Sequence, residues 1–444
     1  CALPIFAPLP TYIFMLMSDL NFAEVSKSKD TATKTKVLFL TNYFPPDYAA
    51  TGQLIDELTK TLSEKGLEIR VFTGQPGYAF QKAEAPRRET VEEVEIRRTR
   101  ASQLWPQRIR GKAINGLIFF VRAALHLLRH PRGQNLVVTT TAPPFLPALA
   151  YLGYFFLRLP YVIIIYDLYP DIAIALGVVS RTSPLIKLWQ AANYWIWKNA
   201  RSIIVLTPAM KEAIVDACPE VAKQVAIIHN WADGDYIMPR PKQENWFAEK
   251  HDLVDKFTVL YSGNMGRCHD LITIIQAAQY LQEQPIQFVL IGDGAQYDSL
   301  RRGAKQLGLT NILFLPYQDK EVLPYSLTAC DLSLISIAEG MEKLVAPSKL
   351  YSTLAVGRPV AAICSEKSFL RDIVAEAECG KSFANGDGLA LAQFITELEA
   401  HPEMAKRMGQ AARQYFSTHF TREIASNQYL TVLQNASSSK PKDI

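Results

Sequence analysis

The sequence lacks several patterns that would place it in a familiar class. Its six cysteines (positions 1, 218, 268, 330, 364 and 379) form no CxxC pair. Disulfide frameworks and zinc sites need paired spacing, so we expect reduced thiols in a cytoplasmic compartment. No GxGxxG occurs, which disfavours a nicotinamide dehydrogenase. No stretch reaches the ~18 uninterrupted apolar residues that a membrane-spanning helix needs.

The chain also has little net charge. The formal net charge of +4 is too small to indicate nucleic acid as a partner, and 49% hydrophobic with 20% charged residues is typical of a globular protein. Basic residues are nevertheless concentrated in the N-terminal half: Arg97, Arg98, Arg100, Arg108, Arg110, Lys112, Arg122, Arg129 and Arg132. Such residues lie either on solvated faces or on a face that meets anionic lipid or a lipid-linked diphosphate. The sequence leaves both open.

The two ends of the sequence are distinct from the rest. Residues 1–20 contain an apolar run without an initial methionine, a basic region or a clear cleavage site. We expect a misplaced start, with Met15 or Met17 as the initiator, and a weak membrane anchor is the alternative. Residues 1–35 form a disordered or misplaced tail in this interpretation, and residues 435–444 a disordered one.

A length of 444 residues predicts two or three domains, and two of ordinary size fit best. In residues 36–235, apolar strands alternate with amphipathic helices, which predicts a doubly wound α/β domain. Its expected strands are 36–43, 67–73, 94–99, 135–141, 160–166, 202–206 and the start of 225–233. Its expected helices are 54–62, 114–128 and one that begins after Thr207. His126 and His130 lie four residues apart, but no third ligand accompanies them, so we expect no metal site.

A charged linker at 236–255 leads to a second domain of the same kind at 256–418. We expect its strands to begin near 257 and to cover 286–291, 312–315, 331–337 and 360–364, with a helix at 389–398. A last helix covers 419–434. Asp233-Gly234-Asp235 spells a DxD metal motif, but its position in the exit loop indicates a turn.

The stretch from 335 to 363 is the most informative part of the chain. An apolar strand enters a loop with Glu339 and Gly340, and the chain then passes Ser348 and Lys349 into a short helix. Loops at the carboxyl ends of parallel strands are where such sheets bind ligands. Unpartnered amides of a first helical turn attract an anion, and Lys349 adds a full positive charge. This stretch therefore predicts a diphosphate site.

The run AEGMEKLVAPSKLYSTLAVGRPVAA (residues 338–362) resembles the donor-binding segment of the retaining family-4 glycosyltransferases of GT-B fold. It is most similar to the branch that adds amino sugars during exopolysaccharide and O-antigen assembly. The resemblance covers about residues 36–433. It implies two Rossmann-like domains that face each other across a cleft, with the C-terminal helix returning to the first. It further implies a UDP-sugar donor, a lipid-linked or saccharide acceptor, and no metal or other cofactor.

The resemblance also assigns roles to individual residues. Lys349, Arg267, Asp167 and Glu339 are the expected catalytic residues. The expected donor-binding residues are Gly52, Gly263, Asn264, Gly266, Gly292, Gly294, Tyr317, Gly340, Ser348 and Ser352. Many members carry two glutamates where this chain has Leu344 and Ser352, so either Glu339 or Glu342 would replace the first. The second, usually credited with a ribose contact, has no counterpart.

Other interpretations remain open. Gly52 and the strand-end glycines also suit ordinary turns, and Asp167 could cap its own loop. A GT-B epimerase of UDP-sugars and a non-catalytic nucleotide-sugar-binding subunit are alternative functions. We favour a cytoplasmic protein attached peripherally to the inner face of the membrane.

Overall fold

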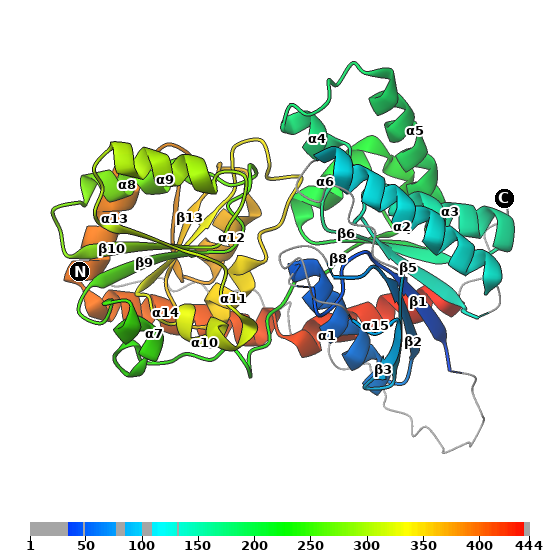
Figure 1. Cartoon of the computed structure of the whole chain (residues 1–444), viewed down its shortest axis with the longest axis horizontal. Coiled ribbons are helices and arrows are strands. Elements are labelled where there is room, and N and C mark those ends of the chain that lie inside the picture. The colour runs from blue at the N-terminus through cyan, green and yellow to red at the C-terminus, as the bar shows by residue number, and fades with distance from the viewer. Residues whose placement is uncertain (1–33, 48, 77–84, 100–108, 131–132, 439–444) are drawn as a thin grey trace, which may run out of the picture. The chain divides into compact units, whose positions relative to one another are not determined.

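The computed structural model describes residues 34–47, 49–76, 85–99, 109–130 and 133–438, and the side chains of 109–113 are outside this description. The chain divides into two units, Cys1–Lys34 and Thr35–Ile444, and every described helix and strand belongs to the second. The opening residues, the end of the tail, and the basic residues Arg100, Arg108 and Arg132 lie outside the described part. Figure 1 shows the arrangement of the elements.

The first sheet has eight strands in the order β3-β4-β2-β1-β5-β6-β7-β8. All neighbours are parallel except the antiparallel pair of β3 and β4. The central strands β5 and β6 are buried along their whole length, as expected for a sheet covered on both faces. The bounds are Lys36–Leu40 (β1), Glu68–Thr73 (β2), Arg88–Val91 (β3), Val94–Arg98 (β4), Leu136–Thr140 (β5), Tyr161–Ile165 (β6), Ser202–Val205 (β7) and Val225–Ile227 (β8).

Six of the described helices lie between these strands along the chain. They are Ala50–Glu64 (α1), Ile109–Arg129 (α2), Leu146–Leu157 (α3), Asp171–Ala175 (α4), Pro184–Asn199 (α5) and Pro208–Ala217 (α6). Helix α6 starts as predicted, because the hydroxyl of Thr207 accepts a hydrogen bond from the amide of Met210. Asp233 forms the predicted turn, since its carboxylate accepts from the amides of Asp235 and Tyr236.

The second sheet has six parallel strands in the order β11-β10-β9-β12-β13-β14. The bounds are Phe257–Ser262 (β9), Ile286–Ile291 (β10), Ile312–Leu315 (β11), Leu332–Ser336 (β12), Val360–Ile363 (β13) and Gly380–Phe383 (β14). Its helices are Trp246–Lys250 (α7), Ile272–Tyr280 (α8), Tyr297–Gln306 (α9), Leu323–Ser326 (α10), Lys349–Ala355 (α11), Phe369–Glu376 (α12), Gly388–Ala400 (α13) and Pro402–His419 (α14). In Figure 1, α8 and α9 lie on one side of this sheet, and α10, α11 and α14 lie on the other.

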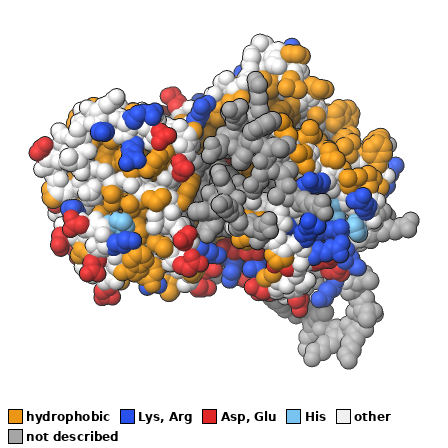
Figure 2. Space-filling model, viewed as in Figure 1, with side chains coloured by type: hydrophobic (Ala, Val, Ile, Leu, Met, Phe, Trp, Pro, Cys, Tyr) orange, Lys and Arg blue, Asp and Glu red, His pale blue; other side chains and the backbone are white. Residues whose placement is uncertain are grey.

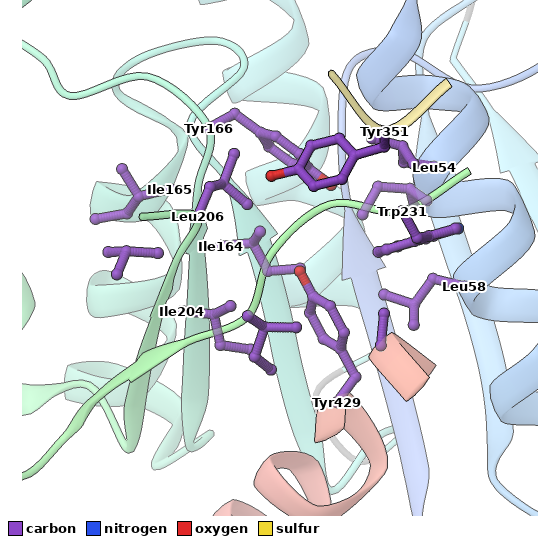
Figure 3. Packing of buried hydrophobic residues seen from close by; sticks show 14 of the residues in the cluster. Leu54, Leu58, Ile164, Ile165, Tyr166, Ile204, Leu206, Trp231, Tyr351 and Tyr429 are labelled. Carbon is purple, nitrogen blue, oxygen red and sulfur yellow. The ribbon is translucent and has the colours of Figure 1, made fainter. Parts of the chain in front are cut away.

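The last helix, α15 (Arg422–Ser438), returns to the first sheet, as predicted. Figure 3 shows Tyr429 of this helix packed among Leu58, Ile164 and Ile204, all members of one buried cluster. Lys65 of the first half also forms a 2.6 Å ion pair with Glu423. The predicted α/β class with two doubly wound sheets is therefore confirmed.

Several details differ from the sequence predictions. Strand β3 and helices α3, α5 and α14 had not been predicted. The linker contains α7, which Asn245 caps by accepting from the amides of Phe247 and Ala248. Helix α15 continues four residues beyond the expected end at 434, because Ala436 is still buried against the core.

Candidate functional site

The ammonium of Lys349 occupies an enclosed position at the carboxyl end of β9. Its Nζ lies 3.9 Å from the centroid of the Tyr261 ring and donates a hydrogen bond to the hydroxyl of the same residue. That hydroxyl in turn donates to the carbonyl of Asn264 at 2.8 Å. Since Tyr261 is fully buried at the end of the strand, it offers Lys349 both a π-face and an acceptor in one fixed place.

The described surroundings of Lys349 provide no negatively charged partner. Loss of water lowers the pKa of this ammonium from 10.5 to about 7, although the residue as a whole is only partly buried. Among the described residues, no carboxylate forms an ion pair with it. A cation held in this way gains more from an incoming anion than a solvated one would.

His269 lies beside the same ammonium. Burial, with a smaller contribution from the charge of Lys349, lowers the pKa of its imidazole to about 3. Its Nδ1 lies 2.7 Å from the carbonyl oxygen of Ser336. A carbonyl only accepts, so Nδ1 carries the proton and Nε2 of the neutral ring is an acceptor. His269 can therefore accept a hydrogen bond from a hydroxyl group but adds no positive charge.

Three glycines bring the ends of neighbouring strands together. Gly263, Gly292 and Gly294 have φ angles of 134°, 137° and 151°, which other residues rarely adopt. A Cβ at Gly292 would lie 2.0 Å from the carbonyl oxygen of Gly263, and one at Gly294 would lie 2.6 Å from Met265. The loops after β9 and β10 therefore touch backbone to backbone, and only glycine permits it.

Gly263 also contacts the lysine directly. A Cβ there would lie 3.2 Å from Cε of Lys349. Asn264 and Arg267 of the same loop are exposed, and a Cβ at Gly266 would lie 2.9 Å from the Asn264 side chain. Gly263 is therefore the residue of this loop that lies against Lys349, while Asn264 and Arg267 are exposed to solvent.

Tyr317 follows the next strand, β11. Its hydroxyl lies 3.4 Å from the carbonyl oxygen of Asp293, which directly follows Gly292. The structure thus brings the predicted residues of the loops after β9, β10 and β11 to one edge of the sheet.

Helix α11 differs from the prediction at its start. The amides of Leu350 and Tyr351 already bond to the carbonyls of Pro347 and Ser348, so they are not the unpartnered donors that were expected. Ser348 is exposed, and its side chain caps nothing in the helix. Each of these amides donates to the carbonyl three residues earlier, as in a 3₁₀ turn, so neither is free to bind a ligand. These two amides therefore add no free donors beside the ammonium of Lys349.

Ser352 occupies the place of the missing second glutamate. Its hydroxyl donates to the carbonyl of Lys349 at 3.1 Å, one helical turn back. Helix α11 is itself fixed by Tyr351, because the buried ring of this residue meets Phe420 edge-on with 5.0 Å between centroids. This contact also fixes the backbone of Lys349, which begins the helix. Ser352 thus supports the helix locally.

The loop before α11 separates the two candidate glutamates. Glu342 is buried, and its carboxylate accepts from the amide of Gly340 at 3.2 Å, whereas Glu339 and Gly340 are exposed. Lys343 forms ion pairs with Glu212 at 3.0 Å and with Asp216 at 3.7 Å. Glu342 therefore shapes the loop and also lines the cavity described below, whereas Glu339 is exposed to solvent.

Asp167 lies at the end of β6 and meets this loop. It forms an isolated antiparallel bridge with Val345, and the amide of Leu168 donates to the carbonyl of Leu344 at 3.2 Å. Burial raises the pKa of Asp167 to about 6. The pKa of the Cys268 thiol is raised to about 11, mainly by burial and to a smaller extent by the charge of Asp167. Asp167 and the loop after β9 are therefore close.

Gly52 lies in the first turn of α1. A Cβ there would meet the backbone of Tyr43 and Phe44 at 3.0 and 3.1 Å. This glycine lets the loop after β1 pack directly on the helix. That packing explains the residue without a ligand, and its predicted donor contact stays a prediction.

A cavity of about 990 Å³, lined by both apolar and polar residues, adjoins the loop that holds Glu342 and Lys343. Its other walls come from α4, α5 and α6, with Asp171, Asn193 and Glu212 among the lining residues. Carboxylates and amides of this kind can hydrogen-bond to the hydroxyl groups of a saccharide.

The described residues contain no group of three or more His, Cys, Asp or Glu side chains placed to hold a metal ion. None of their helices combines the length and apolar character needed to cross a membrane.

Tyr261 and His269 had not been assigned roles from the sequence. Tyr261 reads as one more apolar strand residue, and 88 positions separate it from Lys349. Only the pairing of β9 with β12 brings the two segments together. A local pattern could not have revealed this contact.

Two family profiles match the chain. Residues 51–236 match "Glycosyltransferase Family 4", and residues 242–415 match "Glycosyl transferases group 1". Among curated proteins, a Pseudomonas aeruginosa protein named "Probable glycosyltransferase WbjE" is 26% identical over 62% of this chain and 68% of its own length. WcaI of Escherichia coli K12, whose name describes a colanic acid biosynthesis glycosyl transferase, is 25% identical over 72% of this chain and 81% of its own length.

Solved structures share the fold across nearly the whole chain. Sucrose-phosphate synthase from Thermosynechococcus elongatus superposes with a TM-score of 0.72 at 19% identity, over 90% of this chain and 98% of its own. HepE of Anabaena, solved with UDP and glucose, gives 0.68 at 15% identity, over 90% and 99%. WaaG, a glycosyltransferase involved in lipopolysaccharide biosynthesis, gives 0.66 at 16% identity, over 89% and 99%.

Proposed function

Because the chain belongs to the family-4 glycosyltransferases of GT-B fold, we propose that it transfers a hexosyl or N-acetylhexosaminyl group from a UDP-sugar, with retention of anomeric configuration. The acceptor in this proposal is lipid-linked or a saccharide of exopolysaccharide, capsule or O-antigen assembly. The complex of HepE with UDP and glucose supports the donor, and the names of WcaI and WaaG support the pathway class.

The observation that carries the proposal is the ammonium of Lys349. It is desolvated, held against Tyr261 and Gly263, and has no carboxylate partner among the described residues. Transfer breaks the bond between the anomeric carbon and a diphosphate oxygen, and the bonding electrons remain on the diphosphate. A cation fixed at that oxygen stabilises the transition state more than the ground state, because the negative charge grows as the bond breaks.

The other residues take supporting roles in this proposal. The backbone at Gly263, Asn264 and Gly266 and the guanidinium of Arg267 approach the diphosphate. Gly292, Gly294 and Tyr317 face the nucleoside.

Sugar and acceptor contacts come from the second group of residues. Gly340 and Glu339 approach the donor sugar, and Asp167 accepts a hydrogen bond from a sugar or acceptor hydroxyl. The acceptor oxygen replaces the phosphate oxygen on the anomeric carbon and gives up its proton.

Release of UDP from a panel of nucleotide sugars, with membrane extract as the acceptor source, tests the proposal. We expect Lys349→Ala to lower release at least about a hundredfold, in the range seen when a transition-state hydrogen-bond donor is removed. Lys381→Ala, at an exposed position on β14 of the same sheet, is the matched control and keeps wild-type turnover. Wild-type turnover by the Lys349 variant refutes the assignment. Sugar-nucleotide isomerisation without acceptor indicates an epimerase instead.

Two further parts of the proposal concern conditions and location. The reaction proceeds without a metal ion, so UDP release should be unchanged by a chelator such as EDTA. The protein works in the cytoplasm, attached peripherally to the inner face of the membrane. Cell fractionation that leaves it wholly in the high-speed supernatant, even at low salt, contradicts this location.

A further inference from the structure

Helix α2 exposes a continuous apolar stripe that glycosyl transfer does not use. Its members are Ile114, Leu117, Val121, Leu125 and Leu128, each between 38% and 61% exposed. At 100° per residue these positions fall within an arc of about 80° on one side of the helix. The opposite side carries Phe119, Ala123 and Leu127 into the core. The stripe is therefore a second apolar face of a helix whose core face is already buried.

Helix α3 extends this surface. It exposes Leu152, Phe155 and Phe156, the last of them 70% exposed. The two helices are neighbours, since Phe120 of α2 meets Phe145 at the start of α3 edge-on at 5.8 Å. Figure 2 shows hydrophobic side chains gathered where Figure 1 places these helices, with Lys and Arg beside them. Contiguous apolar patches of this kind mark interaction sites, whereas single exposed residues do not.

A basic pocket of about 470 Å³ lies next to the stripe, at the C-terminal end of α2. None of its described lining residues is acidic. Its arginines are Arg87, Arg88, Arg97, Arg98, Arg122 and Arg129, and two histidines join them. The antiparallel pairing of β3 and β4 sets Arg88 directly opposite Arg97. Like charges in such a pair repel each other, and a bound anion would relieve that repulsion.

Arg97 and Arg98 differ in the charge of the groups that they contact. Arg98 is neutralised by an ion pair with Glu89. Arg97 approaches the ring of His130 at 3.5 Å, which provides no negative charge. His126 stacks on Phe72 with 4.4 Å between ring centroids, and burial lowers its pKa to about 4, so it is neutral at pH 7. The pocket is thus cationic and open toward the apolar stripe through Leu125, which lines both.

We propose that the basic pocket and the apolar surface of α2 and α3 together dock the protein on an anionic phospholipid bilayer, with a headgroup phosphate in the pocket. Apolar side chains beside arginines on one helix suit the bilayer interface, where the former enter the acyl boundary and the latter meet phosphate. A soluble anion would leave the apolar surface uncovered. A second copy packed on the same face would bring a second arginine cluster to the first. The proposal rests on the proposed function only for its peripheral location, which it deepens by naming the surface.

Co-sedimentation of the full chain with vesicles tests the charged half of this surface. Wild-type protein should bind a phosphatidylcholine–phosphatidylglycerol mixture more tightly than phosphatidylcholine alone. The double variant Arg97→Gln/Arg129→Gln should weaken that binding by about 25-fold, at about fivefold per arginine near an anionic surface. The matched control Arg301→Gln/Arg302→Gln removes two exposed arginines of α9 and should bind like wild type.

The apolar half has its own pair of variants. Leu117→Ser/Val121→Ser should weaken binding to both kinds of vesicle, because less apolar surface enters the interface. Ile272→Ser, at a 56% exposed residue at the start of α8, is the control and should not.

Four outcomes would overturn the proposal. They are equal binding of wild type to neutral and anionic vesicles, an arginine variant that matches its control, binding of glycerol phosphate without vesicle binding, and self-association that the Leu117→Ser/Val121→Ser change abolishes. UDP release measured without vesicles, with detergent-solubilised membrane extract as the acceptor source, should be unchanged in all four variants. Its absence in the wild type would refute the proposed function and leave the vesicle result to stand alone.

Discussion

Binding of the donor diphosphate should be coupled to uptake of a proton by Lys349. In the free protein, loss of water holds the pKa of this ammonium at about 7, far below its usual value of 10.5. A diphosphate beside it favours the charged form and therefore raises its pKa. The lysine thus gains a proton when UDP binds at any pH between its pKa in the free protein and its higher pKa in the complex.

The size of the effect follows from these values. With a pKa of about 7, the free lysine is half protonated at pH 7 and about one-tenth protonated at pH 8. If the bound lysine stays protonated, binding at pH 8 takes up about 0.9 proton. The affinity for UDP should then fall about fiftyfold between pH 7 and pH 9, since only the protonated fraction binds well.

Titration calorimetry of UDP in buffers of different ionisation enthalpy measures the uptake directly. The range from pH 7 to 9 is suitable because the second phosphate ionisation, near pH 6, is complete there. In Lys349→Arg the side chain stays charged throughout, so proton uptake should vanish even if the affinity changes. Wild-type binding at pH 8 without proton uptake, or uptake that persists in Lys349→Arg, would show that another group responds to the ligand.

Three other substitutions test the surroundings of this lysine. Gly292→Ala should yield little folded protein, because its Cβ would lie 2.0 Å from a carbonyl oxygen, whereas Gly303→Ala meets nothing within 4 Å and should keep the wild-type melting temperature. Tyr261→Phe removes the hydroxyl that accepts from Lys349 and should lower kcat about tenfold, equivalent to one hydrogen bond to a charged group. Transfer should weaken as pH falls through about 6, where the buried Asp167 takes up a proton, and Asp167→Asn should remove that acid limb.

Much of the fold was accessible from the sequence because buried parallel strands read as continuous apolar runs. The predicted ranges 286–291 and 312–315 coincide with β10 and β11. Strand β3 was missed because it lies at a sheet edge and alternates exposed with partly buried residues. Helix α3 was missed because it is apolar on nearly all sides, so its sequence has no helical periodicity to detect.

The candidate site was predictable only where one strand end carries its own motif. The glycines at 263, 292 and 294 could be located because each lies within three residues of the end of an apolar strand. All three have a positive φ. The pairing of Lys349 with Tyr261 could not, because it joins segments that only the sheet brings together. The amides of α11 were expected to be free, but a sequence does not show whether a first helical turn closes on itself.

Exposure favours Glu339 over Glu342 as the residue that replaces the first family glutamate. A carboxylate that meets a ligand must be accessible, and one that shapes a loop must be bound to it. Glu339 is exposed, whereas Glu342 is buried and holds the amide of Gly340. We therefore expect Glu339→Gln to raise the KM for the donor sugar at least about tenfold, the loss of one charge-assisted hydrogen bond, with no change in melting temperature.

Glu342→Gln should behave in the opposite way. It weakens a buried bond within the loop, so it should lower the melting temperature and reduce kcat through disorder of the loop before Lys349. UDP release kinetics and thermal unfolding on the same two variants separate these effects. If Glu342→Gln raised KM at an unchanged melting temperature while Glu339→Gln had no effect, the buried residue would be the ligand contact. The ligand would then meet Glu342 from the cavity that this residue lines.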